Sequence, residues 1–283
     1  MGARYMGKNR GARYLKRKQQ PKQAEIADRH YLYEQSVQGV EHEAEFIADT
    51  YKEIRGGEAI ILREDFCGTA NAACEWVRVN DKHLAICVDL DADVLAYGRD
   101  KHVAALSPEA QRRITLINGD VLTVETEPAD VLAAFNFSYF TFKTREQLRE
   151  YFIAARRALK NDGLFFLDIY GGSEAYQEME EETENDDFTY VWDQASYDPV
   201  TGDYHCYIHF RFADGSEMTR AFSYDWRLWS VPEVRELLEE AGFSSSTVYW
   251  EGTDKDGEGD GVFTPVERGE ADEAFVSYII AQP

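Results

Sequence analysis

The chain has 283 residues, which is enough for one large α/β domain with an insertion or for two small domains. It carries 53 acidic against 30 basic residues and a net charge of −23, a balance that repels nucleic acid unless a local basic patch intervenes. The longest apolar runs are too short for a membrane helix or a secretory core, so no membrane partner is expected.

The first 24 residues depart from this acidic balance. They hold eight Lys or Arg and no acid, and they have few aliphatic side chains to bury. This composition predicts a basic, disordered tail over residues 1–24, followed by a folded domain over residues 25–283. An arm that contacts nucleic acid or an acidic partner is the alternative interpretation of this segment.

Helical and apolar segments alternate through the first half of the domain. Residues 25–55 have helical spacing, and Gly56-Gly57 ends that pattern. Short apolar runs, each followed by a helical segment or a turn, then indicate buried strands over residues 59–62, 84–88, 114–117, 131–135 and 164–167. The alternation predicts a mostly parallel sheet with right-handed crossovers and helices on both faces.

The pattern changes after the fifth strand. Residues 174–187 contain eight acids and no base, which favours an exposed loop or a solvated helix. Residues 188–228 alternate with period two around two turns, which predicts an antiparallel insertion of about three strands. A capped helix begins at Ser230, and two last strands are expected over residues 246–250 and 275–281, on either side of an acidic, glycine-rich loop over residues 251–261.

The cysteines and histidines indicate buried thiols and no metal site. The four cysteines form no C-x-x-C pair, and the six histidines are scattered. Reduced, buried thiols are typical of a cytoplasmic protein, which is the expected location.

Acidic residues follow the first three strands. Glu64–Ala70 is a tight turn that leads straight into a helix, where Gly68 lets the backbone approach a ligand and the first helical amides offer donors. Asp89 follows the second strand, where a carboxylate can accept both hydroxyls of a ribose. Asp120 follows the third strand and could accept hydrogen bonds from an adenine amino group. Because parallel strands end at one edge of the sheet, we expect these three tips to bind one adenosine.

In this order of motifs the chain resembles class I S-adenosylmethionine-dependent methyltransferases that act on small molecules. The run Leu62–Ala70 is similar to the family's first motif, an acid followed by G-x-G-x-G, with Phe66 and Ala70 in place of the outer glycines. Further similar segments, spread over residues 25–283, are Val88–Asp91, Gly119–Val121, Ala129–Asn136, Leu159–Leu164 and Trp229–Phe243. A nicotinamide dehydrogenase would leave the Gly119-Asp120 pair unexplained.

The resemblance implies a doubly wound, mostly parallel seven-stranded sheet, the Rossmann-like methyltransferase fold, with an antiparallel insertion after strand five. It also implies S-adenosylmethionine as cofactor, and residues 25–55 as a lid over it. Glu64 is preferred over Asp65 as the acid that faces the methionine amino group, whereas Arg63 either pairs with a neighbouring acid or holds the cofactor carboxylate. The expected cofactor-binding residues are Tyr33, Glu64, Phe66, Cys67, Gly68, Thr69, Ala70, Asp89, Leu90, Asp120, Val121, Phe135 and Asn136.

Methyl transfer needs mainly alignment of a nucleophile and exclusion of water, so no fixed catalytic motif is expected. Tyr139 and His209 are the candidates for a base or an acceptor-positioning group. Many aromatic residues and an acidic surface favour a cationic or amine acceptor, with N-methylation ahead of O-methylation. The acceptor site is expected from residues 135–140, from Arg29, Tyr31 and Tyr33, and from His205, His209, Tyr224, Trp226 and Arg227 of the insertion, which could also form a homodimer contact.

Two other functions stay open at this point. The basic tail suits an RNA or protein methyltransferase, although residues 130–140 lack the Asn/Asp-Pro-Pro-Tyr/Phe motif that base-amino methyltransferases use. The altered first motif suits a non-catalytic regulatory protein that binds the cofactor.

Overall fold

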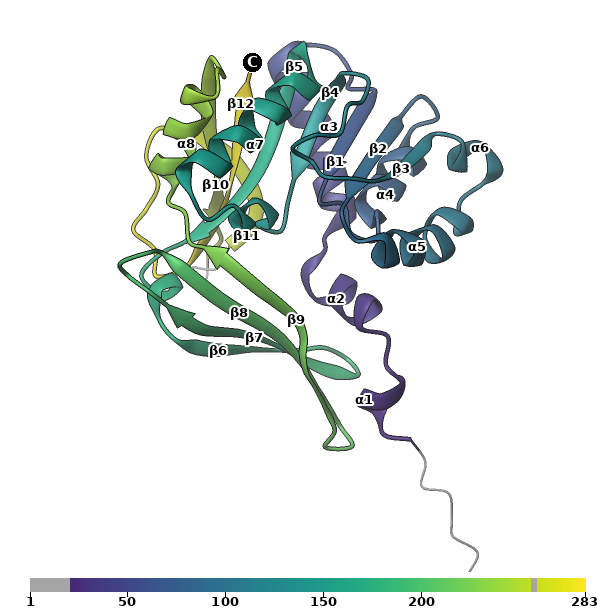
Figure 1. The fold of residues 1–283 in the computed structure, drawn as a ribbon, viewed down its shortest axis with the longest axis vertical. Helices are drawn as coiled ribbons and strands as arrows, with labels where there is room; N and C mark the ends of the chain where they lie inside the picture. Colours follow the sequence, from purple (N-terminus) through teal and green to yellow (C-terminus); the bar gives the residue numbers. More distant parts are fainter. Residues whose placement is uncertain (1–20, 256–258) are drawn as a thin grey trace, which may run out of the picture.

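The computed structural model describes residues 21–255 and 259–283. Its main sheet has eight strands in the order β11-β10-β12-β5-β4-β1-β2-β3 (Figure 1). Five of them are mutually parallel: β1 (Ile61–Asp65), β2 (Leu84–Asp89), β3 (Ile114–Asn118), β4 (Ala129–Ala134) and β5 (Leu159–Gly171). The antiparallel strands are β10 (Ser245–Thr253), β11 (Gly259–Val266) and β12 (Phe275–Gln282).

Each face of the main sheet packs on its own helices. Along β5, Phe165 and Leu167 belong to one buried cluster, whereas Leu164 and Phe166 belong to the other, as the alternation of a strand requires. The first cluster includes side chains of α7 (Arg145–Ala158) and α8 (Val231–Glu240). The second includes side chains of α3 (Val40–Arg55), α4 (Asn71–Val79), α5 (Ala92–Lys101) and α6 (Pro108–Gln111). The predicted doubly wound architecture is therefore confirmed.

A second, four-stranded antiparallel sheet is inserted between β5 and α8, below the main sheet in Figure 1. Its strands are β6 (Met179–Glu184), β7 (Phe188–Tyr197), β8 (Asp203–Phe212) and β9 (Glu217–Arg227). The sequence predicted about three strands over residues 188–228 and a loop or helix over residues 174–187. The three strands predicted over residues 188–228 are present as β7, β8 and β9. The prediction of a loop or helix over residues 174–187 was wrong, because β6 pairs with β7 along its whole length and begins the insertion sheet.

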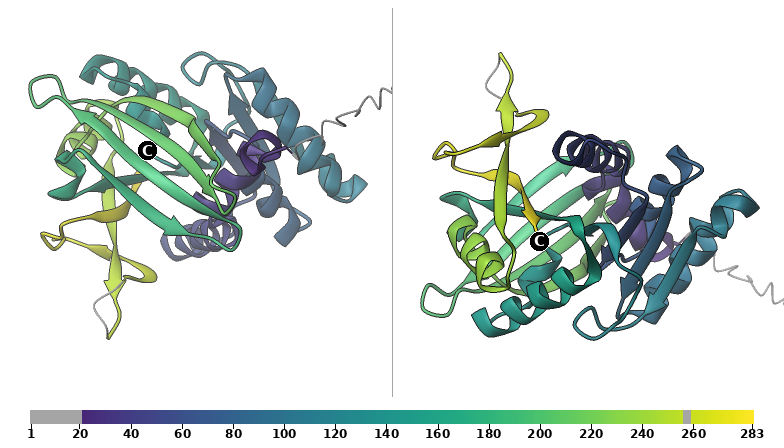
Figure 2. Two further views of the ribbon diagram at one scale, coloured as in Figure 1. Left: turned by 90° about the horizontal axis from the view of Figure 1, so that it is seen from below. Right: turned by 90° about the horizontal axis from the view of Figure 1, so that it is seen from above.

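The predicted loop over residues 251–261 was also partly wrong. Strand β10 extends to Thr253, and β11 begins at Gly259 and pairs with it at the edge of the main sheet. This edge strand adds an eighth strand to the seven that were expected. Figure 2 shows β10 and β11 projecting from the body of the molecule.

The first two helices of the described chain lie next to the insertion (Figures 1 and 2). Residues 1–20 of the predicted tail lie outside the described residues. The predicted boundary at residue 25 is corrected, because α1 (Gln23–Ile26) begins within the last residues assigned to the tail. The backbone N–H of Gln23 donates to Asp214, in the turn between β8 and β9. Helix α2 (Arg29–Val37) follows, so residues 25–55 form separate helices. In the described part of the chain, every helix is too short or too polar to cross a membrane.

Candidate cofactor site and adjoining cavity

The turn after β1 keeps a glycine-like backbone without the outer glycines. Phe66, Gly68 and Ala70 have φ values of 57°, 53° and 56°, in the left-handed region that favours glycine. The two non-glycine residues are those that replace glycines of the first motif. The side chains of this turn differ from those of that motif, but Phe66 and Ala70 adopt the left-handed conformation that glycine favours at these positions.

Contacts from neighbouring strands and helices hold this turn in place. The backbone N–H of Gly68 donates to Asp89 Oδ2 at 2.8 Å, and the N–H of Cys67 donates to the carbonyl of Val88 at 3.1 Å. Asp89 Oδ1 accepts from the N–H of Asp91 at 2.8 Å. The tips of β1 and β2 are therefore joined through the Asp89 carboxylate.

A cavity of about 620 Å³, which we call the strand-tip cavity, opens at the carboxyl ends of β1, β2, β3 and β4. Of the thirteen residues expected to bind the cofactor, only Ala70 does not line it, because that side chain is fully buried behind the turn. The expected residues that line it together are Tyr33, Glu64, Phe66, Cys67, Gly68, Thr69, Asp89, Leu90, Asp120, Val121, Phe135 and Asn136.

The acids at the end of β1 have different surroundings. Asp65 is buried and accepts from Arg63 Nε at 2.8 Å and from the Tyr151 hydroxyl at 3.2 Å. Arg63 thus pairs with a neighbouring acid, one of the two alternatives left open. Glu64 lines the cavity, and its buried Oε2 has no hydrogen-bond partner among the described residues. Burial, with a smaller effect of the nearby Glu43 carboxylate, raises the pKa of Glu64 to about 8. A cationic ligand group beside Glu64 would relieve this unfavourable burial.

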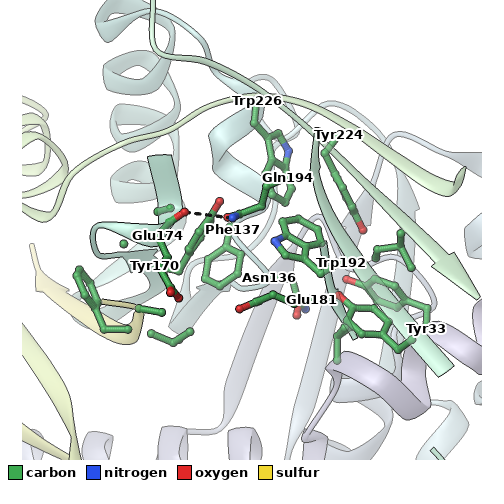
Figure 3. Close-up of a pocket in the computed structure, with 18 of the residues that line it drawn as sticks. Tyr33, Asn136, Phe137, Tyr170, Glu174, Glu181, Trp192, Gln194, Tyr224 and Trp226 are labelled. Atoms are coloured by element: carbon green, nitrogen blue, oxygen red, sulfur yellow. Dashed lines mark hydrogen bonds between the residues drawn. The ribbon is translucent and has the colours of Figure 1, made fainter. Parts of the chain in front are cut away.

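A second cavity of about 420 Å³, which we call the adjoining cavity, lies beside the first (Figure 3). Tyr33, Asn136, Tyr224 and Trp226 line both cavities. The remaining wall is rich in aromatic rings and includes three glutamates. None of the described residues that line it is a lysine, an arginine or a histidine. Those other aromatic and acidic lining residues are Phe137, Tyr170, Tyr190, Trp192, Phe275, Glu174, Glu181 and Glu251.

Tyr139 lies outside both cavities, so its predicted catalytic role is corrected. Its side chain is fully buried, and its hydroxyl donates to the carbonyl of Asp168 at 2.8 Å. Burial also raises the pKa of this phenol well above its usual value. Tyr139, a residue of η2 (Ser138–Thr141), therefore packs in the core and is not positioned to take a proton from an acceptor.

The second candidate base, His209, also lies outside both cavities. It is buried in the insertion, where its Nδ1 accepts from the backbone N–H of Arg220 at 3.0 Å. Its Nε2 lies 3.2 Å from Asp193 Oδ2, so both ring nitrogens have partners inside the protein. The sequence-based role of His209 is corrected to a structural one.

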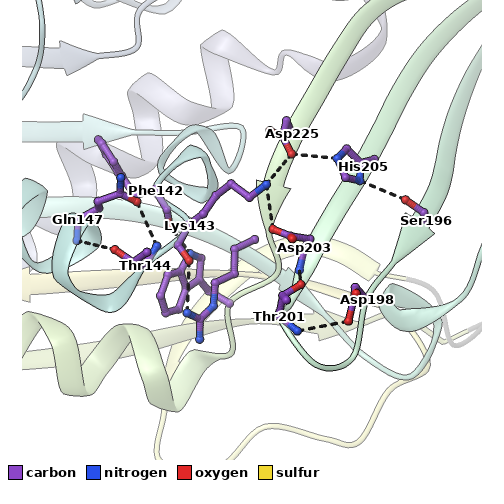
Figure 4. A network of polar contacts seen from close by, with 12 residues as sticks. Phe142, Lys143, Thr144, Gln147, Ser196, Asp198, Thr201, Asp203, His205 and Asp225 are labelled. Carbon is purple, nitrogen blue, oxygen red and sulfur yellow. Dashed lines mark hydrogen bonds and ion pairs between the residues drawn. The ribbon is translucent and has the colours of Figure 1, made fainter.

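Some of the other residues expected at the acceptor site line one of the two cavities, and others line neither. Arg29 lines the strand-tip cavity, and Tyr33, Tyr224 and Trp226 line both cavities, whereas Tyr31, His205 and Arg227 line neither. His205 Nε2 lies 3.0 Å from Asp225, which also binds Lys143 at 2.7 Å (Figure 4). This network joins the loop before α7 to the insertion sheet.

No protein-family model matches the chain, and no curated protein sequence matches it. Solved structures, in contrast, do match the chain. An S-adenosylmethionine-dependent methyltransferase from Clostridium acetobutylicum ATCC 824 superposes with a TM-score of 0.65 and 16% identity, over 89% of this chain and 97% of its own. The chain has the fold of a class I methyltransferase.

Two further structures with this methyltransferase fold carry more specific descriptions. The sugar N-methyltransferase KedS8 from Streptoalloteichus sp ATCC 53650 has a TM-score of 0.61 and 17% identity, over 90% of this chain and 92% of its own. CalS10 from Micromonospora echinaspora, an amino pentose methyltransferase solved with bound S-adenosylmethionine, has a TM-score of 0.61 and 16% identity, over 88% of this chain and 95% of its own.

Proposed function

We propose that this protein is an S-adenosylmethionine-dependent methyltransferase that modifies a small-molecule acceptor, with nitrogen preferred over oxygen. One observation carries the proposal: Gly68, Asp89 and Asp120, at the tips of three adjacent strands, line a single cavity. That cavity shares its wall with the aromatic adjoining cavity, which supplies room for an acceptor. The reported structural likenesses support the same assignment.

The strand-tip residues fit the parts of this cofactor. The Asp89 carboxylate would hold the ribose hydroxyls, and Asp120 would accept from the adenine amino group. Glu64, with its unpartnered buried oxygen, would bind the α-ammonium of the methionine part. A buried carboxylate oxygen that lacks a hydrogen-bond partner is unfavourable unless a ligand cation or donor satisfies it.

The cofactor, when bound, supplies a methyl group on a positively charged sulfur. An acceptor nitrogen bonds to the methyl carbon as the carbon–sulfur bond breaks, and the electron pair of that bond stays on the sulfur. The chain's part is to align the acceptor and to exclude water. Tyr33, Tyr224 and Trp226 are suited to this role because they line the boundary between the two cavities.

The lining of the adjoining cavity supports an amine acceptor. Aromatic faces attract ammonium groups, and the lining acids add negative potential without a lysine or arginine in the described lining to neutralise it. Four buried free cysteines are consistent with a reducing compartment such as the cytoplasm. These features support N-methylation of a small molecule over modification of an anionic polymer.

The test is calorimetry with S-adenosylhomocysteine on the full chain. We expect binding to the wild type and an affinity lower by about tenfold or more for Asp89→Asn, because hydrogen bonds to a carboxylate would be lost. Asp93→Asn is the matched control, since Asp93 is exposed on the first turn of α5 and lines neither cavity. Failure of the wild type to bind would refute the proposal. Labelled S-adenosylmethionine offered with amines, phenols and carboxylic acids then tests the preference for nitrogen.

A further inference from the structure

Strand β6 carries three consecutive glutamates whose side chains differ in their partners. Glu180 Oε2 lies 2.8 Å from Arg211 Nη2, and Glu182 forms an ion pair with the same guanidinium. Successive side chains of a strand point to opposite faces of the sheet, so Glu181 points away from Arg211. Two of the three carboxylates thus share the Arg211 guanidinium on one face, and the third is directed to the other face.

The face that Glu181 occupies is the one that covers the adjoining cavity. Glu181 lies directly opposite Trp192 on β7, and Trp192 lies opposite Ile208 on β8. All three line the adjoining cavity. Ile208 lies opposite Phe222 on β9, which lines the strand-tip cavity. The Glu181 side chain therefore projects into the cavity beside the Trp192 ring (Figure 3).

The Glu181 side chain forms no hydrogen bond or ion pair with any described residue. In contrast, Glu251 Oε1 accepts from the backbone N–H of Gly261 at 2.9 Å. Burial is the main cause of the raised pKa of Tyr190, and the Tyr33 phenol and the Glu181 carboxylate add to it. The Glu181 carboxylate therefore contributes to the electrostatic potential at the Tyr190 hydroxyl.

We infer that Glu181 is the carboxylate that binds the ammonium group of the acceptor, and that it restricts the acceptor to small molecules with a primary or secondary amine. The inference rests on the proposed function, because the adjoining cavity holds an acceptor only if the strand-tip cavity holds the cofactor. Trp192, directly opposite on β7, and Tyr190 line the same cavity, where aromatic rings would add their attraction for the same cation. An alcohol of the same shape would leave the carboxylate without a cation and would lack the attraction between a cation and the rings.

The same contact provides a route for the proton that an ammonium group must lose. The N–H bond breaks and the proton passes to a Glu181 oxygen, which leaves a neutral amine with a free electron pair. That pair forms the new bond to the methyl carbon while the carbon–sulfur bond breaks. The carboxyl group then releases its proton to solvent, and the product leaves as a methylated ammonium ion with S-adenosylhomocysteine.

The experiment compares Glu181→Gln with Glu182→Gln, the same substitution one position along the strand but on the other face. Both positions are exposed, so both variants should fold, which their melting temperatures check. The probes are amine and alcohol pairs of matched shape, glucosamine with glucose and cyclohexylamine with cyclohexanol. Each is titrated by calorimetry into protein saturated with S-adenosylhomocysteine.

We expect at least one amine to bind the wild type and Glu182→Gln about tenfold more tightly than its alcohol, and Glu181→Gln to lose most of that preference. An undiminished preference in Glu181→Gln, or no preference in the wild type, would overturn the inference. Binding of S-adenosylhomocysteine itself, measured first, separates this failure from failure of the proposed function, because the inference can fail while that binding persists. Where an active acceptor is found, Glu181→Gln should raise KM for it and also lower kcat, because both the contact with the cation and the proton acceptor are lost, whereas Glu182→Gln should change neither.

Discussion

The carboxylate of Asp168 accepts a hydrogen bond of 2.6 Å from the backbone N–H of Asn136. It also accepts one of 2.9 Å from Phe137, and these two residues have consecutive left-handed φ values of 56° and 55°. Asn136 lines both cavities. Asp168 is buried near the end of β5, the strand that pairs with β4. Its carboxylate therefore holds a strained turn at the boundary between the two cavities.

Asp168→Asn should disturb that turn. The amide offers one acceptor oxygen for two backbone donors and turns its own NH2 toward the other, which leaves a buried donor unsatisfied. We expect a loss of about 1–3 kcal/mol in the free energy of unfolding, and a fall in turnover of about tenfold or more. Denaturant titration and the labelled-methyl assay check this, with the exposed Asp162→Asn as control. Equal activity of the two variants would contradict the role of Asp168.

Stability should depend on pH through three carboxyl groups. Burial raises the pKa of Glu43 to about 7, of Glu64 to about 8 and of Asp168 to about 7, and Glu43 contributes to the other two shifts. A raised pKa means that the folded state holds its proton longer than the unfolded state. The stabilisation is complete at low pH and is lost as pH rises through the folded pKa.

We therefore expect the free energy of unfolding of the ligand-free protein to fall between about pH 6.5 and 8. Burial lowers the pKa values of His30 and His83 from 6.5, so these groups act in the opposite direction, mainly at and below pH 6.5, and the fall is cleanest above that pH. Glu64→Gln should flatten the fall and be more stable than the wild type at pH 8 and above, yet bind S-adenosylhomocysteine less tightly. Urea titrations at several pH values measure this, and a rise in stability over that range would refute it.

Gly98→Ala should displace the turn of the first motif. A Cβ at Gly98 would lie 2.1 Å from the backbone oxygen of Thr69, so α5 and the turn could not keep their present distance. We expect a cost of about 1–3 kcal/mol in stability and weaker binding of S-adenosylhomocysteine. Gly57→Ala is the control, because a Cβ there meets no atom within 4 Å. Equal binding by both variants would mean that the turn tolerates the shift.

Tyr139→Phe and His209→Gln should leave turnover within about threefold of the wild type. Tyr139→Phe removes one buried hydrogen bond to the carbonyl of Asp168 and should cost about 1 kcal/mol of stability. A loss of activity of about a hundredfold in either variant, with the fold intact by circular dichroism, would restore that residue as a catalytic candidate.

The strand-tip site could be predicted because its signals are local. An apolar run, a turn with Gly68 and an acid after each of the next two strands lie within short segments, and parallel topology brings them to one edge. The left-handed conformations of Phe66 and Ala70 could not be predicted, because non-glycine residues rarely adopt them. They persist here because neighbouring elements hold the turn.

The missed elements are edge strands without a buried face. Strand β6 is largely exposed and consists mostly of acids, and β11 is rich in glycine and exposed along most of its length, so composition resembles a loop in both. Pairing with β7 and β10 determines these strands, and the composition of each strand gives no signal of that pairing. Glu181 was missed for the same reason, since only the register of β6 separates it from Glu180 and Glu182.

All four thiols of the chain are unpaired and buried, and Cys67 lies in the turn that lines the strand-tip cavity. A disulfide reagent such as Ellman's reagent can therefore modify a molecule only after part of it opens. The rate of its colour reaction would time those openings without any added label. Slower modification of Cys67 with S-adenosylhomocysteine present would report ligand protection at that one position.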